Sequence, residues 1–136
     1  MRIEITNKLD ELPVAMAAME EFAAEAGLGA EPRHAMEVAL DELLNNIISY
    51  GYRDAAEHKI QVELLAESDR LTIVISDDAV AFNPFEQDPP DMSQSVEERE
   101  PGGFGIHIVR KLMDECVYRR CGERNIVTLC KYLAQR

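Results

Sequence analysis

Basic residues are scarce in this sequence. Its 136 residues include 14 Lys and Arg against 26 Asp and Glu, which gives a formal net charge of −12. A protein that binds nucleic acid needs a surplus of Lys and Arg to replace the counterions of the phosphates, so direct nucleic-acid binding is not expected. An acidic surface instead keeps a protein soluble and favours basic partners.

Long apolar runs are also missing. No run approaches the roughly 20 residues of a membrane span, and the first residues, MRIEITNKLDEL, lack the apolar core of a signal peptide. Cys116, Cys121 and Cys130 are odd in number and lack the spacing of a metal site, so we expect strand or core thiols. We therefore expect a cytoplasmic protein without membrane partners, folded as a single domain over residues 1–136.

The stretch from residue 32 to residue 52, PRHAMEVALDELLNNIISYGY, has the spacing of a helix that faces a core. Pro32 suits the first turn of such a helix, and Gly51 suits its end. The apolar positions at this spacing are Met36, Ala39, Leu40, Leu43, Leu44, Ile47 and Ile48.

Two polar residues lie on the edge of this apolar stripe. At about 100° per residue, Glu42 and Asn46 are one turn apart on that edge, whereas Asp41 and Asn45 point into solvent. A half-buried carboxylate beside an amide oxygen can accept a proton and hold a hard cation such as Mg²⁺. Taken alone, Glu42 and Asn46 are also typical of a helix flank that is merely solvated. The other motifs of the chain are needed to choose between these two interpretations.

The other elements follow from alternation and helical periodicity. We expect helices over residues 10–26, with Asp10 as the cap, and 105–114, and strands over residues 2–6, 59–65, 70–76, 116–120 and 125–132. The order contains no Rossmann-type βαβ rhythm. It predicts an α+β fold, a two-layer sandwich in which helices cover one face of a mixed, mostly antiparallel sheet.

Periodicity disappears between residues 77 and 103, and a segment of this length is typical of a lid or a binding loop. We expect a lid over about residues 85–102. Asp77 precedes it, in DDAVAFNP, where small residues let the backbone approach a flat ligand. Gly102, Gly103 and Gly105 follow it and open a helix, whose N–H groups can bind an anion. Each feature alone also suits an ordinary turn, but their order together with Glu42 and Asn46 is more specific.

With these pieces in this order, the sequence resembles the anti-sigma-factor serine/threonine kinases of the RsbW and SpoIIAB kind, which belong to the Bergerat-fold (GHKL) histidine-kinase-like ATPases. DELLNNIISYGY is similar to the N box of that family, DDAVAFNP to its first glycine box, and GGFGIHIVRKLMDE to its second. The resemblance covers nearly the whole chain. It implies the Bergerat ATP-binding fold, with ATP and Mg²⁺ as cofactors.

The resemblance also implies roles for single residues. Glu42 would be the general base that takes the proton from a substrate serine, and Asn46 would ligate the Mg²⁺ that bridges the ATP phosphates. Asp77 would accept the N6 amino hydrogen of adenine. The other residues expected to bind ATP are Ala79, Ala81, Phe82, Gly102, Gly103, Phe104, Gly105 and Ile106. The glycines among them, with the N–H groups around them, would cradle the phosphates.

The sequence departs from the family pattern in three places. Ala79 and Ala81 replace glycines, and each methyl is strained only if positive φ is required; otherwise it narrows the adenine wall. Tyr50 replaces the histidine that commonly ends the N box. Residues 86–100 carry six acids and one base, Arg99, which predicts modest ATP affinity and a lid that is disordered without nucleotide.

By the same resemblance, the partners would be an anti-anti-sigma (STAS) protein as the kinase substrate and a sigma factor as the sequestered protein. A homodimer would form through residues 2–26. The alanines and the acidic lid leave open an alternative, a nucleotide-binding interaction module without kinase turnover. A histidine-kinase module would need a long helical hairpin with a phosphoacceptor histidine, and a gyrase-like or MutL-like ATPase would need a transducing domain; neither is expected here.

Overall fold

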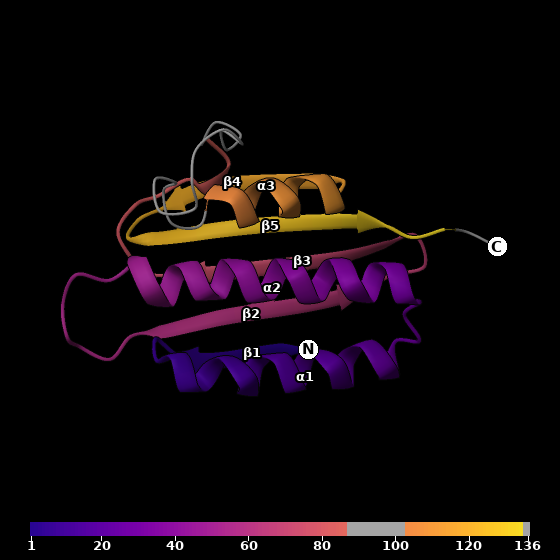
Figure 1. Cartoon of the computed structure of the whole chain (residues 1–136), viewed down its shortest axis with the longest axis horizontal. Helices are drawn as coiled ribbons and strands as arrows, with labels where there is room; N and C mark the ends of the chain where they lie inside the picture. The colour runs from indigo at the N-terminus through magenta and orange to yellow at the C-terminus, as the bar shows by residue number, and fades with distance from the viewer. Residues whose placement is uncertain (87–102, 135–136) are drawn as a thin grey trace.

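The computed structural model describes residues 1–86 and 103–134, and its elements form two layers (Figure 1). All three helices cover the same face of one sheet, with α2 lying across its middle. The helices are α1 (Leu12–Glu25), α2 (Ala30–Tyr50) and α3 (Gly103–Leu112), and the strands are β1 (Arg2–Thr6), β2 (Lys59–Ala66), β3 (Arg70–Asp77), β4 (Glu115–Cys121) and β5 (Arg124–Tyr132). Short 3₁₀ turns occupy Leu9–Glu11 and Pro84–Glu86. The predicted α+β fold is confirmed.

The sheet has the strand order β1-β2-β3-β5-β4, so β1 lies at an edge as expected. The sequence predicted a mixed, mostly antiparallel sheet, and each of the four pairings within the described residues is antiparallel. The crossover through α3 brings β4 into the sheet in the same direction as β3. The chain then turns at Gly122, whose φ is +61°, and β5 takes the place between the two strands.

The core lies between α2 and the helix-facing side of the sheet. The apolar stripe predicted for α2 is confirmed, because Met36, Leu40 and Leu44 are fully buried. Across the sheet, Ile73 pairs with Leu129 and Ile75 pairs with Val127 on the same covered face. Asp41 and Asn45 are exposed, whereas Glu42 and Asn46 are half-buried, as the helical spacing predicted.

The start of every helix differs from the prediction, and α3 begins at Gly103, two residues before the expected start at 105. Asp10 was expected to cap α1, but it lies in a 3₁₀ turn and α1 begins at Leu12 without a side-chain cap. Glu11 instead accepts hydrogen bonds from the backbone N–H and hydroxyl of Thr6, both at 3.1 Å. Helix α2 begins at Ala30, two residues before Pro32, which is tolerated because N–H groups in a first turn have no intrahelical partner.

The remaining structural expectations are simple to place. The thiols of Cys116, Cys121 and Cys130 are free and lie on β4 and β5. No helix among the described residues combines the length and the apolar character needed to cross a bilayer. Gly102 and nearly all of the predicted lid lie outside the described residues, so the lid and its disorder without nucleotide stay predictions.

Candidate functional site

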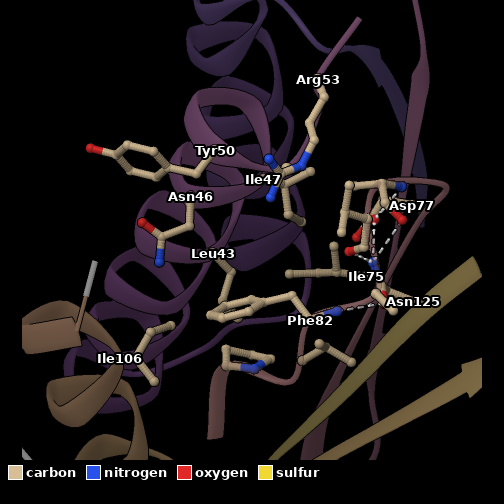
Figure 2. A pocket seen from close by; sticks show the side chains of 16 residues that line it. Leu43, Asn46, Ile47, Tyr50, Arg53, Ile75, Asp77, Phe82, Ile106 and Asn125 are labelled. Atoms are coloured by element: carbon tan, nitrogen blue, oxygen red, sulfur yellow. Dashed lines mark hydrogen bonds between the residues drawn. The ribbon is translucent and has the colours of Figure 1, made fainter. Parts of the chain in front are cut away.

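A cavity of about 400 Å³ lies between α2, the loop that follows β3, and the start of α3 (Figure 2). Its walls are mainly apolar, with contributions from Leu43, Ile47, Ile75 and Val127. The cavity brings together six residues that the sequence predicted for one site: Asn46, Asp77, Ala79, Ala81, Phe82 and Ile106. These residues come from three separate parts of the chain.

Asp77 is the buried acid of the cavity. Its side chain is only 2% exposed, and Oδ1 accepts hydrogen bonds from the Ala79 N–H and from Asn125 Nδ2, both at 2.9 Å. Burial raises the pKa of Asp77, and the bonds from Asn125 and Ala79 oppose that rise. Asp77 lines the cavity, and within the described residues no hydrogen bond reaches its Oδ2.

Asn125 is a site residue that the sequence prediction missed. It lies opposite Asp77 in the β3–β5 register and is 5% exposed. Its Nδ2 also donates to the Val80 carbonyl at 3.0 Å, and its Oδ1 accepts from the Tyr118 hydroxyl at 2.6 Å. Asn125 therefore ties the loop after β3 to the neighbouring strands. The sequence contained one indication of this position. Asn125 lies two residues before the buried Val127, so both side chains face the same side of β5.

The alanines at positions 79 and 81 do not strain the backbone. No residue other than glycine has positive φ in the parts of the chain that the structure describes. Ala79 is buried, and a Cβ added to Gly51 would approach the Ala79 Cβ to 2.9 Å. The sequence left two possibilities, that the methyl of Ala79 strains the backbone or that it narrows the cavity. The structure favours the second, because the methyl packs in the wall without backbone strain.

Glu42 and Asn46 have different surroundings although they are one turn apart. Asn46 lines the cavity, whereas the carboxylate of Glu42 packs against Gly105 in the first turn of α3. A Cβ at Gly105 would overlap that carboxylate, so a larger residue there requires the Glu42 side chain to move. Burial raises the pKa of Glu42; a hydrogen bond with the Asn46 side chain opposes the rise, and the charge of Asp41 adds to it.

The first turn of α3 completes this part of the site. Gly103 is its first residue, and Ile106 is buried and lines the cavity. N–H groups in the first turn of a helix have no intrahelical partner and favour anions. The turn therefore suits a negatively charged ligand beside Glu42 and Asn46.

A magnesium ion with a nucleotide fits the residues present. Within residues 1–86 and 103–134, three or more His, Cys, Asp or Glu side chains nowhere converge on a metal-sized site. Magnesium bound with a nucleotide takes only one or two protein ligands, and phosphates and waters supply the rest. The side-chain oxygen of Asn46, which lines the cavity, is a ligand of the required chemistry.

Comparison with known proteins agrees with this geometry. The sequence model of the family described as histidine kinase-like ATPase domain matches residues 5–131. The serine/threonine-protein kinase BtrW of Bordetella bronchiseptica is 25% identical over 96% of this chain and 98% of its own length. The serine-protein kinases RsbW of Listeria monocytogenes and Bacillus mycoides are 23% and 27% identical, over 98% and 85% of this chain and 87% and 74% of their own lengths.

Proposed function

The chain belongs to the histidine kinase-like ATPase domain family, and from this premise we propose that it is an ATP-dependent protein serine/threonine kinase. The observation that carries the proposal is the position of Glu42. Its carboxylate packs against Gly105 at the start of α3, beside the cavity that Asn46 lines. A base is thus held next to a helix N-terminus that suits phosphates. The relatives named as serine or serine/threonine kinases support the same function.

ATP would lie with adenine at the Asp77 end of the cavity and phosphates at the α3 end. Oδ2 of Asp77 would accept the N6 amino hydrogen, which guanine lacks at that position. The methyl of Ala79 and the side chain of Phe82 would pack on the base or the ribose, next to Ala81. At the other end, backbone N–H groups of residues 102–106 would hold the phosphates.

Asn46 would hold the magnesium ion, which supplies charge neutralisation between the phosphates. Glu42 would take the proton from the hydroxyl of the protein substrate. The hydroxyl oxygen would then form a bond to the γ-phosphorus, while the bond from that phosphorus to its bridging oxygen breaks and ADP leaves. Burial raises the pKa of Glu42, which makes it a stronger base than an exposed carboxylate.

We also propose the biological setting. The substrate would be a STAS-type anti-anti-sigma protein, the sequestered partner a sigma factor, and the compartment the cytoplasm. Homodimers would form through β1 and α1, which lie together at one edge of the fold (Figure 1). Sedimentation at micromolar protein tests the dimer, and a monomer under those conditions would contradict it.

Glu42→Gln tests the kinase proposal, with Asp41→Asn as the matched control. The first change removes the base and keeps the shape, so phosphate transfer to a STAS protein should fall by at least about a hundredfold. ATP binding should stay within a few-fold of the unmodified protein, because Asn46 and Asp77 remain. The control removes an exposed carboxylate one residue away and should retain most of the transfer rate.

A nucleotide-binding interaction module without turnover is the second candidate function. It is favoured by one observation, that Glu42 is not among the residues that line the cavity. If partner regulation is unchanged in Glu42→Gln while ATP still binds, this second function is the correct one and the kinase proposal is wrong.

A further inference from the structure

Four side chains form a cluster beside the cavity, which we name the His58 cluster: Tyr52, Asp54, His58 and Asp78. The rings of Tyr52 and His58 stack with their centroids 4.3 Å apart. The Tyr52 hydroxyl donates to Oδ1 of Asp78 at 3.1 Å. Nδ1 of His58 lies 3.1 Å from Oδ2 of Asp78, and its Nε2 lies 2.8 Å from Oδ1 of Asp54. The cluster thus joins the segment after α2 to the residue after Asp77.

Both ring nitrogens of His58 face a carboxylate oxygen. A neutral imidazole has one N–H and one lone pair, so it can donate to only one carboxylate and turns its lone pair toward the other. The imidazolium donates at both ends. The geometry therefore requires the charged ring for both bonds to form, and the two aspartates, Asp78 first, raise the pKa of His58.

No other charge competes for the ring among the described residues. The end of β1 contributes neutral Asn7, whose Oδ1 accepts from the His58 N–H at 2.8 Å. The two charged residues next to His58 in sequence form ion pairs with other residues. Glu57 pairs with Lys8, and Lys59 pairs with Glu4. The charge of Asp77 acts on Tyr52, whose pKa it raises together with burial.

The cluster is connected directly to the cavity wall. Asp78 stands between Asp77 and Ala79, and both of these line the cavity. On the other side, Gly51 also lines the cavity, accepts a hydrogen bond from the Val80 N–H at 3.1 Å and lies against Ala79. The two segments that make this wall are therefore the same two segments that the His58 cluster joins.

We propose that His58 is a positioning residue of the nucleotide site, whose imidazolium bridges Asp54 and Asp78 and holds the wall at Gly51 and Ala79. This inference rests on the proposed ATP site. Because the pKa of His58 is raised above its ordinary 6.5, the bridge is complete below that ordinary value. It is lost as pH rises through the raised value, and nucleotide affinity falls with it.

The test compares magnesium-ATP affinity of the full chain and of His58→Gln between about pH 6 and about pH 9. The phosphates of ATP also titrate in this range and change its affinity for both proteins. The affinity of the unmodified chain is therefore divided by that of the variant at the same pH. The ratio of the two affinities should be several-fold in favour of the unmodified chain at the acidic end and should approach one at the alkaline end. His34→Gln, which removes an exposed histidine of α2, should leave the profile unchanged.

Ring-proton NMR of the histidines gives a second readout that does not need nucleotide. The His58 signal should titrate above the ordinary histidine value of about 6.5. Asp54→Asn should lower its midpoint and shift the fall in affinity with it. A constant affinity ratio, or a His58 midpoint no higher than the ordinary histidine value of about 6.5, overturns the inference. Absence of ATP binding by the unmodified chain at every pH instead overturns the proposed function on which it rests.

Discussion

Small side chains pack at their limit around the cavity. Gly51 and Ala79 touch, and no additional methyl fits between them. Ala79 is buried with ordinary backbone dihedrals, so its methyl contributes packing and carries no backbone strain. Ala79, at a position where the family pattern has glycine, can thus pack in the cavity wall without strain.

Ala79→Gly should therefore destabilise the protein. The change removes a buried methyl and adds freedom to the unfolded chain, which together cost about 1–2 kcal/mol of unfolding free energy. Ala81→Gly is the matched control: Ala81 is exposed, so only the backbone term of about 0.4–1 kcal/mol applies. Urea denaturation measures both. A more stable Ala79→Gly variant would mean that the alanine is strained, against this account.

Residues of the site differ in how far the sequence could reveal them. Glu42 and Asn46 follow from helical spacing and Asp77 from the end of a strand, because these are local patterns. Asn125 needs the β3–β5 register to meet Asp77. The His58 cluster was missed, since its contacts form only when two loops meet.

At the scale of elements, α2 and α3 make a close contact at Glu42 and Gly105. The carboxylate of Glu42 occupies the space where a side chain of residue 105 would begin. The close packing of Glu42 on the start of α3, where the proposed site would hold phosphates, thus involves a glycine that has no positive φ.

Gly105→Ala should disturb this contact. The added methyl must displace either the Glu42 side chain or α3, which typically costs about 1–3 kcal/mol of unfolding free energy. Phosphate transfer should fall as well. The double variant with Glu42→Ala should recover most of the stability, because the clash is removed, and should stay inactive.

The control for this change is Gly29→Ala, where the nearest atom to an added Cβ lies 4.0 Å away. It should change stability by much less. Additive effects of Gly105→Ala and Glu42→Ala in the double variant would show that the two sites do not touch, and the contact would be refuted.

Element boundaries show where local rules compete. Asp10 has the chemistry of a helix cap, but the 3₁₀ turn at Leu9–Glu11 delays α1 to Leu12. Helix α1 ends at Glu25, close to the expected residue 26. Gly27 follows with φ of +66°, a conformation that few other residues adopt at low cost. The ends of α1 and α2, which precede Gly27 and Gly51, were thus closer to the prediction than their starts.

At the scale of the whole molecule, the order of elements and the single covered face of the sheet were predictable from periodicity. The pairing partners were not, because alternation in β5 is the same whether it lies at an edge or in the middle. Only the structure places β5 between β3 and β4, and this placement brings Asn125 to Asp77.

The central claim is that the cavity between Asp77 and the start of α3 binds magnesium-ATP through Asn46. Calorimetric titration of the unmodified chain, Asn46→Ala and the control Asn45→Ala tests it most directly. Asn45 is the exposed neighbour of Asn46. Among the described residues its side chain forms a hydrogen bond only with the Ser49 hydroxyl. We expect magnesium-dependent binding by the unmodified chain and the control, and affinity about tenfold lower or worse in Asn46→Ala. No binding by the unmodified chain at millimolar ATP, or equal binding by all three, would contradict the account.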